Sequence, residues 1–181
     1  MDWEFTVLNM MQKYLRSPVL DAITITVSTL GKLGLIWIVM AIICLITKKY
    51  RRLGTKMSLA LILTLINCSF ILKPVVQRIR PYILNPNIQL MLSPEFDTSF
   101  PSGHTFFAFS TATVCFMYNK KLGIGMYIFA LAMAFSRMYL YFHFPTDVIF
   151  GAIFGIITGI IAGKLDNYIF EDHIPLTSKS Y

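Results

Sequence analysis

Residues 122–163 read LGIGMYIFALAMAFSRMYLYFHFPTDVIFGAIFGIITGIIAG, two apolar runs separated by a short polar break. A helix needs about 20 mostly apolar residues to cross about 30 Å of hydrocarbon, and each run comes close to that length. The break holds Arg137, His143 and Asp147, which are expensive in hydrocarbon unless they are paired. The stretch therefore predicts two membrane helices whose connected ends carry functional polar residues.

The rest of the chain extends this pattern. Of its 181 residues, 56% are hydrophobic and only 14% are charged, so the bilayer is the expected solvent. The sequence predicts an all-α, polytopic membrane helix bundle of about six transmembrane helices. We expect one membrane-embedded domain over residues 1–170 and a short polar tail over 171–181. The apolar stretches cover approximately 18–30, 33–47, 57–72, 104–118, 122–142 and 147–163.

The N-terminal segment has a different pattern. Between residues 2 and 15, apolar residues recur at helical spacing and polar residues lie between them, which predicts an amphipathic helix at the membrane interface. The apolar set is Phe5, Leu8, Met11 and Leu15, and the polar set is Glu4, Gln12 and Lys13.

Basic residues indicate the orientation. Lys and Arg cluster in residues 48–56, and Lys120 is followed by Lys121, which places both loops in the cytoplasm. With six spans, both termini are then cytoplasmic. The long loop 73–103 and the turn 143–146 lie outside, at the extracytoplasmic face of a plasma membrane.

The net charge of +7 does not indicate nucleic acid binding. The apolar chain offers no basic, aromatic-interleaved surface on which a strand could lie, so the charge reflects topology and an anionic substrate. The three cysteines form no spaced pattern, which argues against a disulfide framework or a zinc site.

Three segments place polar residues at helix ends on the same outer face: 73–81 (KPVVQRIRP), 101–104 (PSGH) and 136–147 (SRMYLYFHFPTD). Left bare in hydrocarbon, Lys73, Arg80 and Arg137 together cost about 9 kcal/mol. These cations need an anionic partner. Nearby carboxylates provide one solution, and phosphate oxygens suit forked guanidinium donors at least as well.

The PSGH segment has the features of an anion-binding helix start. Pro101 and Ser102 open a helix whose first amides lack intrahelical partners, and Gly103 permits a close approach of phosphate to the backbone. An ordinary helix cap has the same composition, so this segment alone leaves both interpretations open.

The histidines favour the functional interpretation. Asp147 follows His143 by four residues and can turn back to the imidazole, which fixes the tautomer and leaves the second nitrogen as a nucleophile. His104 is then the acid for the leaving oxygen. A packing histidine or a His/Asp metal pair is the alternative, but the surrounding cations would repel a metal ion.

These motifs resemble the type 2 phosphatidic acid phosphatase family, which also includes the vanadium haloperoxidases. Its signature is K-x6-RP, PSGH and SR-x5-H-x3-D, and this chain matches every position at the same spacing. The resemblance implies a nucleophile at His143, its partner at Asp147 and an acid at His104. It implies phosphate binding and no required metal or other cofactor. The implied phosphate-binding residues are Lys73, Arg80, Ser102, Gly103 and Arg137, while Arg78 and Ser136 have no assigned role.

We therefore expect an integral membrane phosphatase that acts on a lipid phosphate or diphosphate through a phosphohistidine. Undecaprenyl pyrophosphate is the favoured substrate because the predicted site faces outward. Phosphatidylglycerophosphate and phosphatidic acid are alternatives. A non-catalytic transporter or scaffold that kept the fold is an alternative of another class. The sequence indicates no oligomeric state.

Overall fold

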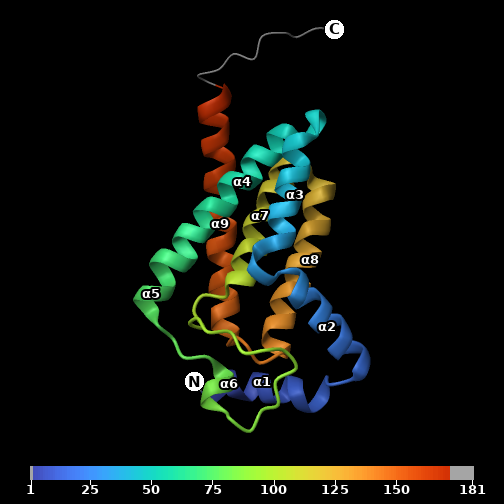
Figure 1. Cartoon of the computed structure of the whole chain (residues 1–181), viewed down its shortest axis with the longest axis vertical. Helices are drawn as coiled ribbons and strands as arrows, with labels where there is room; N and C mark the ends of the chain where they lie inside the picture. The colour runs from blue at the N-terminus through green and yellow to red at the C-terminus, as the bar shows by residue number, and fades with distance from the viewer. Residues whose placement is uncertain (1, 172–181) are drawn as a thin grey trace.

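The computed structural model describes residues 2–171, apart from the side chains of residues 2, 33 and 169–171, and it is helical throughout its regular elements (Figure 1). Residues 172–181, which form most of the predicted tail, lie outside the described residues. The elements are α1 (Asp2–Tyr14), α2 (Pro18–Leu30), a 3-10 turn (Lys32–Gly34), α3 (Leu35–Ile46), a 3-10 turn (Lys48–Tyr50), α4 (Arg51–Leu65), a π-helix (Ile66–Leu72), α5 (Lys73–Val76), α6 (Pro81–Leu84), α7 (Gly103–Tyr118), α8 (Lys120–Tyr139) and α9 (Pro145–Glu171).

The centre of the bundle is α7, which packs against α4, α8 and α9. Glycines on α9 permit a close approach to α7. A Cβ added at Gly155 would lie 2.8 Å from the carbonyl oxygen of Phe106, and one added at Gly159 would lie 2.6 Å from that of Ser110. Any larger residue would push the two helices apart. The polar ends of α7 and α9 are thereby held next to each other.

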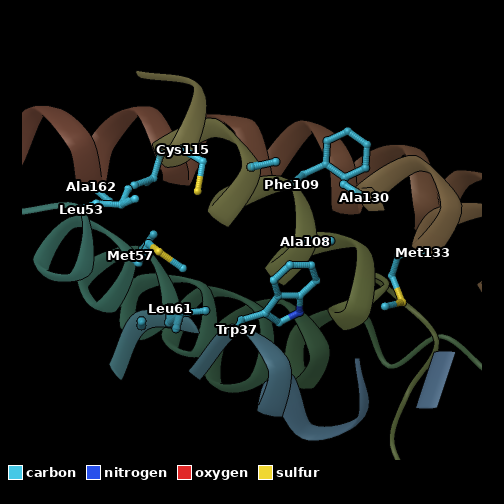
Figure 2. Packing of buried hydrophobic residues seen from close by; sticks show 14 of the residues in the cluster. Trp37, Leu53, Met57, Leu61, Ala108, Phe109, Cys115, Ala130, Met133 and Ala162 are labelled. Atoms are coloured by element: carbon cyan, nitrogen blue, oxygen red, sulfur yellow. The ribbon is translucent and has the colours of Figure 1, made fainter. Parts of the chain in front are cut away.

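The buried core lies beside this helix pair. Figure 2 shows the Trp37 indole near Ala108 of α7, with Met57 and Leu61 of α4 nearby. Trp37 and Met57 are both fully buried. Because α3, α4 and α7 bury these residues together, the core keeps the start of α7 in a fixed position.

The predicted all-helical fold is confirmed, and each predicted apolar stretch contains a helix. Six spans are not reached. Three helical segments in the described chain are long and apolar enough to cross a membrane, or four if the α2–α3 pair counts as one span. At 1.5 Å per residue, α2 and α3 rise only about 20 and 18 Å, and α7 about 24 Å, against about 30 Å of hydrocarbon.

The α2–α3 pair bears on the predicted topology. The two helices are bent by 55° and run in the same general direction across the bundle (Figure 1). Consequently α1 lies at the end that holds α5 and α6, whereas the end of α9 lies at the opposite end. Contacts agree: Glu4 pairs with Arg78, while Asp166 pairs with Arg52. The described ends of α1 and α9 thus lie at opposite ends of the bundle, whereas the prediction of six crossings placed both termini on one side of the membrane.

The segment that carries Lys73 and Arg80 follows a π-helix, in which the helical pitch changes. The π-helix Ile66–Leu72 joins α4 directly to α5, which starts at Lys73. Gln77 then adopts a left-handed conformation with φ of 46°, and the helix ends there. The wider turn of the π-helix sets the direction in which Lys73 leaves the helix.

Helix α1 lies across the end of the bundle (Figure 1). Leu8 and Met11 face inward, as predicted, and Trp3 and Tyr14 are exposed. Glu4 departs from the prediction. It was placed on the polar face, but it is only 4% exposed and points toward the bundle.

Candidate active site

The three predicted segments converge at one end of the bundle. Lys73 starts α5, Gly103 starts α7, and Arg137 lies in the last turn of α8. His143 lies in the tight connection from α8 to α9, and Asp147 lies in the first turn of α9. Four helix ends thus bring together side chains that are up to 74 residues apart in the sequence.

Two carboxylates of the segment between α6 and α7 connect the cations. Glu95 lies 2.5 Å from the guanidinium of Arg137 and 2.7 Å from that of Arg80. Asp97 pairs with both Arg80 and Lys73. The side chains of Arg80 and Arg137 are each only 1% exposed, so their charges require such partners. The predicted need for anionic partners is met by Glu95 and Asp97.

These ion pairs lower the pKa values of the two carboxylates. Burial works against ionisation of Glu95, but the guanidiniums of Arg137 and Arg80 outweigh it and lower the pKa of Glu95 below its usual value. For Asp97, Lys73 and Arg80 likewise outweigh burial and lower the pKa to about 2. Both carboxylates are therefore negatively charged at neutral pH, and they occupy the donors that a phosphate would need.

His143 is buried and held at both ring nitrogens. Its Nδ1 lies 2.7 Å from the carbonyl oxygen of Ser99, and its Nε2 lies 3.2 Å from a guanidinium nitrogen of Arg80. Because a carbonyl only accepts and a guanidinium only donates, Nδ1 carries the hydrogen and Nε2 presents its lone pair. Burial, and then the charges of Arg80 and Arg137, hold the pKa of His143 well below its usual value.

Asp147 does not hydrogen-bond His143. Its Oδ2 lies 3.8 Å from Nδ1, which is within ion-pair distance but too far for a hydrogen bond. The carboxylate instead accepts from the Ser99 hydroxyl at 2.5 Å, the Phe144 amide at 2.9 Å and the Arg78 guanidinium at 2.5 Å. The Ser99 carbonyl is the hydrogen-bond partner of Nδ1. The predicted direct contact between Asp147 and His143 is therefore replaced by a contact through Ser99.

His104 lines a cavity of about 190 Å³. The imidazole of His104 lies against Gly31, which ends α2. A Cβ added at Gly31 would be 2.8 Å from the Cδ2 atom of His104. Arg137 and Glu95 line the same cavity, which is therefore charged on one side. The remaining lining residues are Ser28, Thr29, Lys32, Leu92, Ser93, Pro94 and Phe142.

Ser102 and Gly103 lie outside the lining of this cavity. The Ser102 hydroxyl lies 2.9 Å from that of Thr105, and its amide donates to the carbonyl of Asp147 at 3.0 Å. A Cβ added at Gly103 would meet only the Cys68 sulfur, at 3.7 Å. Neither lines the cavity, so their phosphate contact stays a prediction.

Four supporting residues were missed or left without a role. Ser99 contacts both His143 and Asp147, and the hydroxyl of Ser28 accepts from Arg137 at 2.5 Å. Arg78 bridges Asp147 and Glu4. No motif marks Ser99 or Ser28. Glu4 had a signal, because it precedes Leu8 by four residues and thus shares that residue's buried face.

A comparison with known sequences identifies this arrangement. The PAP2 superfamily profile matches residues 53–170, well over half of the chain. The chain belongs to the PAP2 superfamily. This match covers every motif residue from Lys73 to Asp147, and the chain carries several candidate membrane spans.

Individual PAP2 relatives are more distant. The chain is 31% identical over 121 residues to a protein of Sulfolobus acidocaldarius named undecaprenyl-diphosphatase, covering 64% of this chain and 56% of that one. It is 36% identical over 74 residues to the bacitracin transport permease protein BcrC of Bacillus licheniformis, covering 41% of this chain and 36% of that one. The chain thus spans about a third to just over half of these relatives.

A solved structure agrees over more of the chain. The crystal structure of LpxE from Aquifex aeolicus superposes with a TM-score of 0.78 at 31% identity, covering 88% of this chain and 94% of that one. This chain is therefore similar to LpxE over almost its whole PAP2 fold.

Proposed function

We propose that this protein hydrolyses a terminal phosphate from a lipid phosphate or diphosphate through a phosphohistidine at His143, without a metal ion. The observation that carries the proposal is the tautomer of His143. The Ser99 carbonyl holds the hydrogen on Nδ1, so Nε2 is unprotonated and its lone pair faces the Arg80 guanidinium. A nucleophile is thus placed beside a group that binds phosphate oxygens.

The first chemical step transfers the phosphoryl group. Nε2 of His143 forms a bond to phosphorus while the bond from phosphorus to the leaving oxygen breaks. His104 donates a proton to that oxygen. The phosphate brings negative charge into a cavity lined by His104 and Arg137, and this charge favours the protonated imidazole.

The second step releases phosphate. A water molecule attacks phosphorus, His104 takes its proton, and the bond between phosphorus and Nε2 breaks. Lys73, Arg80 and Arg137 bind the phosphoryl oxygens and stabilise the charge that spreads over them. In this proposal Glu95 and Asp97 give up these cations when phosphate arrives, while Ser102 and Gly103 supply donors at the start of α7.

A metal is not required by this scheme. The three cations supply the charge stabilisation that a metal would otherwise provide. Among the side chains that the structure describes, no three from histidine, cysteine, aspartate or glutamate gather as a candidate metal site.

The favoured substrate is undecaprenyl pyrophosphate. A relative named undecaprenyl-diphosphatase shares 31% identity over 64% of this chain, which supports this choice. Phosphatidylglycerophosphate and phosphatidic acid are the alternative substrates. We also propose that residues 1–170 act as one domain in the plasma membrane, that the end bearing residues 48–56 is cytoplasmic and that the site faces outward.

The number of crossings follows from this orientation. We propose five, in which α2 and α3 form one broken span and α7 is completed by flanking residues. Helix α1 then lies at the outer interface, on the same side as the site.

The test is phosphate release by purified protein in detergent, with and without chelator, over a panel of the three lipids and a soluble phosphate monoester. We expect release that survives the chelator and is inhibited by vanadate, with the highest kcat/KM for undecaprenyl pyrophosphate. His143→Ala should release no phosphate. Release that requires a metal, or that persists in His143→Ala, would contradict the mechanism. Substrate transport without hydrolysis would favour the transporter alternative.

A further inference from the structure

Arg78 connects two acidic residues from opposite ends of the sequence. One guanidinium nitrogen donates to Asp147 Oδ1 at 2.5 Å, and the other donates to Glu4 Oε2 at 2.6 Å. The side chains of Asp147 and Glu4 are only 0% and 5% exposed, and that of Arg78 is 21% exposed. One cation is thus shared between two buried carboxylates.

The shared guanidinium is held in a single position. It lies over the Phe144 ring at 4.1 Å from the ring centroid, and it donates to the Thr146 hydroxyl at 2.6 Å. That hydroxyl in turn donates to Glu4 Oε1 at 2.5 Å. Glu4 therefore touches both Arg78 and the start of α9, one residue before Asp147.

The position of Glu4 depends on how α1 packs. Leu8 is fully buried beside Tyr141 and Phe144, and the Phe5 ring meets the Phe144 ring edge to face at 5.2 Å. At the other end of α1, Gln12 donates to the carbonyl of Tyr139 at 2.5 Å. The helix is therefore also anchored at a point outside the carboxylate network.

The charges of this network bear on the reaction. When Nε2 of His143 binds phosphorus, the ring that keeps its hydrogen on Nδ1 becomes positively charged. Asp147, 3.8 Å from Nδ1, stabilises that charge. The cation of Arg78 on the far side of Asp147 opposes this effect, and the carboxylate of Glu4 offsets that cation.

We propose that Glu4 is a positioning residue for phosphoryl transfer: it holds Arg78 and balances its charge, so that Arg78 does not cancel the effect of the Asp147 carboxylate on His143. This inference rests on the proposed function. It makes α1, which carries none of the motif residues, a working part of the active site. Glu4 acts through Arg78 and touches no reacting atom.

The test compares Glu4→Gln, Glu4→Asp and Gln12→Ala in the full chain, in detergent, with farnesyl diphosphate as the soluble prenyl substrate. Glu4→Gln keeps the shape but loses the charge, and we expect kcat to fall about tenfold while KM stays within about twofold. Glu4→Asp keeps the charge and should lose only about two- to threefold. Gln12→Ala loosens α1 without touching the network, so it should lower Tm but leave kcat within about twofold.

A second variant tests the network at Arg78 instead of at Glu4. Arg78→Lys keeps the charge but cannot donate to both carboxylates at once, so kcat should again fall about tenfold with KM unchanged. Thermal unfolding of each variant checks that it is folded, and this variant decides the question if Glu4→Gln does not fold.

Three results would overturn the proposal: an unchanged kcat in Glu4→Gln, an equal loss in Gln12→Ala, or a loss in Glu4→Asp as large as in Glu4→Gln. The last two would show that packing of α1, and not charge, is what matters. Wild-type protein that releases no phosphate would overturn the proposed function and this inference together, whereas an active wild type with an unaffected Glu4→Gln overturns this inference alone.

Discussion

The Nδ1 atom of His143 lies 2.7 Å from the backbone carbonyl oxygen of Ser99. The same residue donates its hydroxyl hydrogen to Asp147 at 2.5 Å. The orientation of the imidazole thus depends on a backbone group, and the position of that backbone depends on the carboxylate. A change in Asp147 should therefore reach His143 by two routes, through its charge and through Ser99.

These two routes can be separated. Ser99→Ala removes the hydroxyl but keeps the carbonyl that orients His143, so we expect kcat to fall only about tenfold. Asp147→Asn removes the negative charge as well, and kcat should fall by at least about a hundredfold. Steady-state kinetics on the same lipid phosphate measure both. Equal losses in the two variants would indicate that the charge of Asp147 has no separate effect.

The low pKa of His143 predicts the pH dependence. Burial, together with Arg80 and Arg137, lowers this pKa well below the usual value of 6.5, so the imidazole stays neutral as the pH falls through 6.5. The acidic limb of kcat/KM should therefore lie below pH 6.5. The unfolded chain takes up the proton near pH 6.5, so the contribution of this residue to stability is present above that pH and declines as the pH falls toward the folded-state pKa.

A pH profile from about 4 to 9 measures this limb, and a second substrate with a different phosphate pKa identifies the part that belongs to the substrate. Asp97, with a pKa of about 2, titrates below this range. A limb centred at or above pH 6.5 for both substrates would contradict the prediction.

Glu95 should compete with phosphate for Arg137 and Arg80. Removing its charge in Glu95→Gln takes the carboxylate from Arg137 and leaves Arg80 paired with Asp97 alone, and we expect vanadate to inhibit about tenfold more strongly. The buried Arg137 also loses its ion pair, so Tm should fall. Inhibition curves and thermal unfolding in detergent provide the two readouts.

Asp97→Asn is the matched control, because the Asp97 side chain is 54% exposed and leaves Arg137 paired with Glu95. Its effect on vanadate inhibition should be smaller. Weaker inhibition of Glu95→Gln than of the wild type would show that Glu95 helps to bind the anion.

Cysteine labelling tests the five-crossing topology. In a background without the native cysteines, single cysteines replace Tyr14, Lys49 and Asn85. A membrane-impermeant thiol reagent applied to intact cells should modify positions 14 and 85 and leave position 49 unmodified. The side chain of Tyr14 is on an exposed part of α1, with 67% of the residue accessible.

Position 14 distinguishes the two topologies, because six crossings would place it in the cytoplasm. Modification of position 49 alone would reverse the proposed orientation. Permeabilised cells serve as the control that all three cysteines react.

Much of this architecture was predictable from local sequence. Apolar runs indicated the helices, and the charged residues at the ends of those runs indicated one shared polar face. Lys73, Arg80 and Arg137 did converge through the shared carboxylates Glu95 and Asp97, at one end of the bundle. Residue spacing along one helix also placed Leu8 and Met11 on the buried side of α1.

Other features depend on contacts that local sequence does not encode. The partner of His143 is a backbone carbonyl, and every residue has one, so Ser99 could not be singled out. Glu4 reaches Thr146 across 142 residues. Between α2 and α3, Gly34 adopts a left-handed conformation with φ of 70°, and at Gly31 the side chains of Met133 and His104 leave no room for a Cβ, which is a property of the packed bundle.

The π-helix before Lys73 has a consequence for sequence alignment and for engineering. An α-helix advances by about 100° per residue, so the rotational setting of Lys73 depends on how many residues precede it. A return of the seven residues Ile66–Leu72 to regular α-helical winding, at about 100° instead of about 85° per residue, would rotate the lysine by about a quarter to a third of a turn. The ammonium would then point away from Asp97, although no charged residue had been altered. The π-helical winding of this apolar segment is thus under the same constraint as the identity of the cation that follows it.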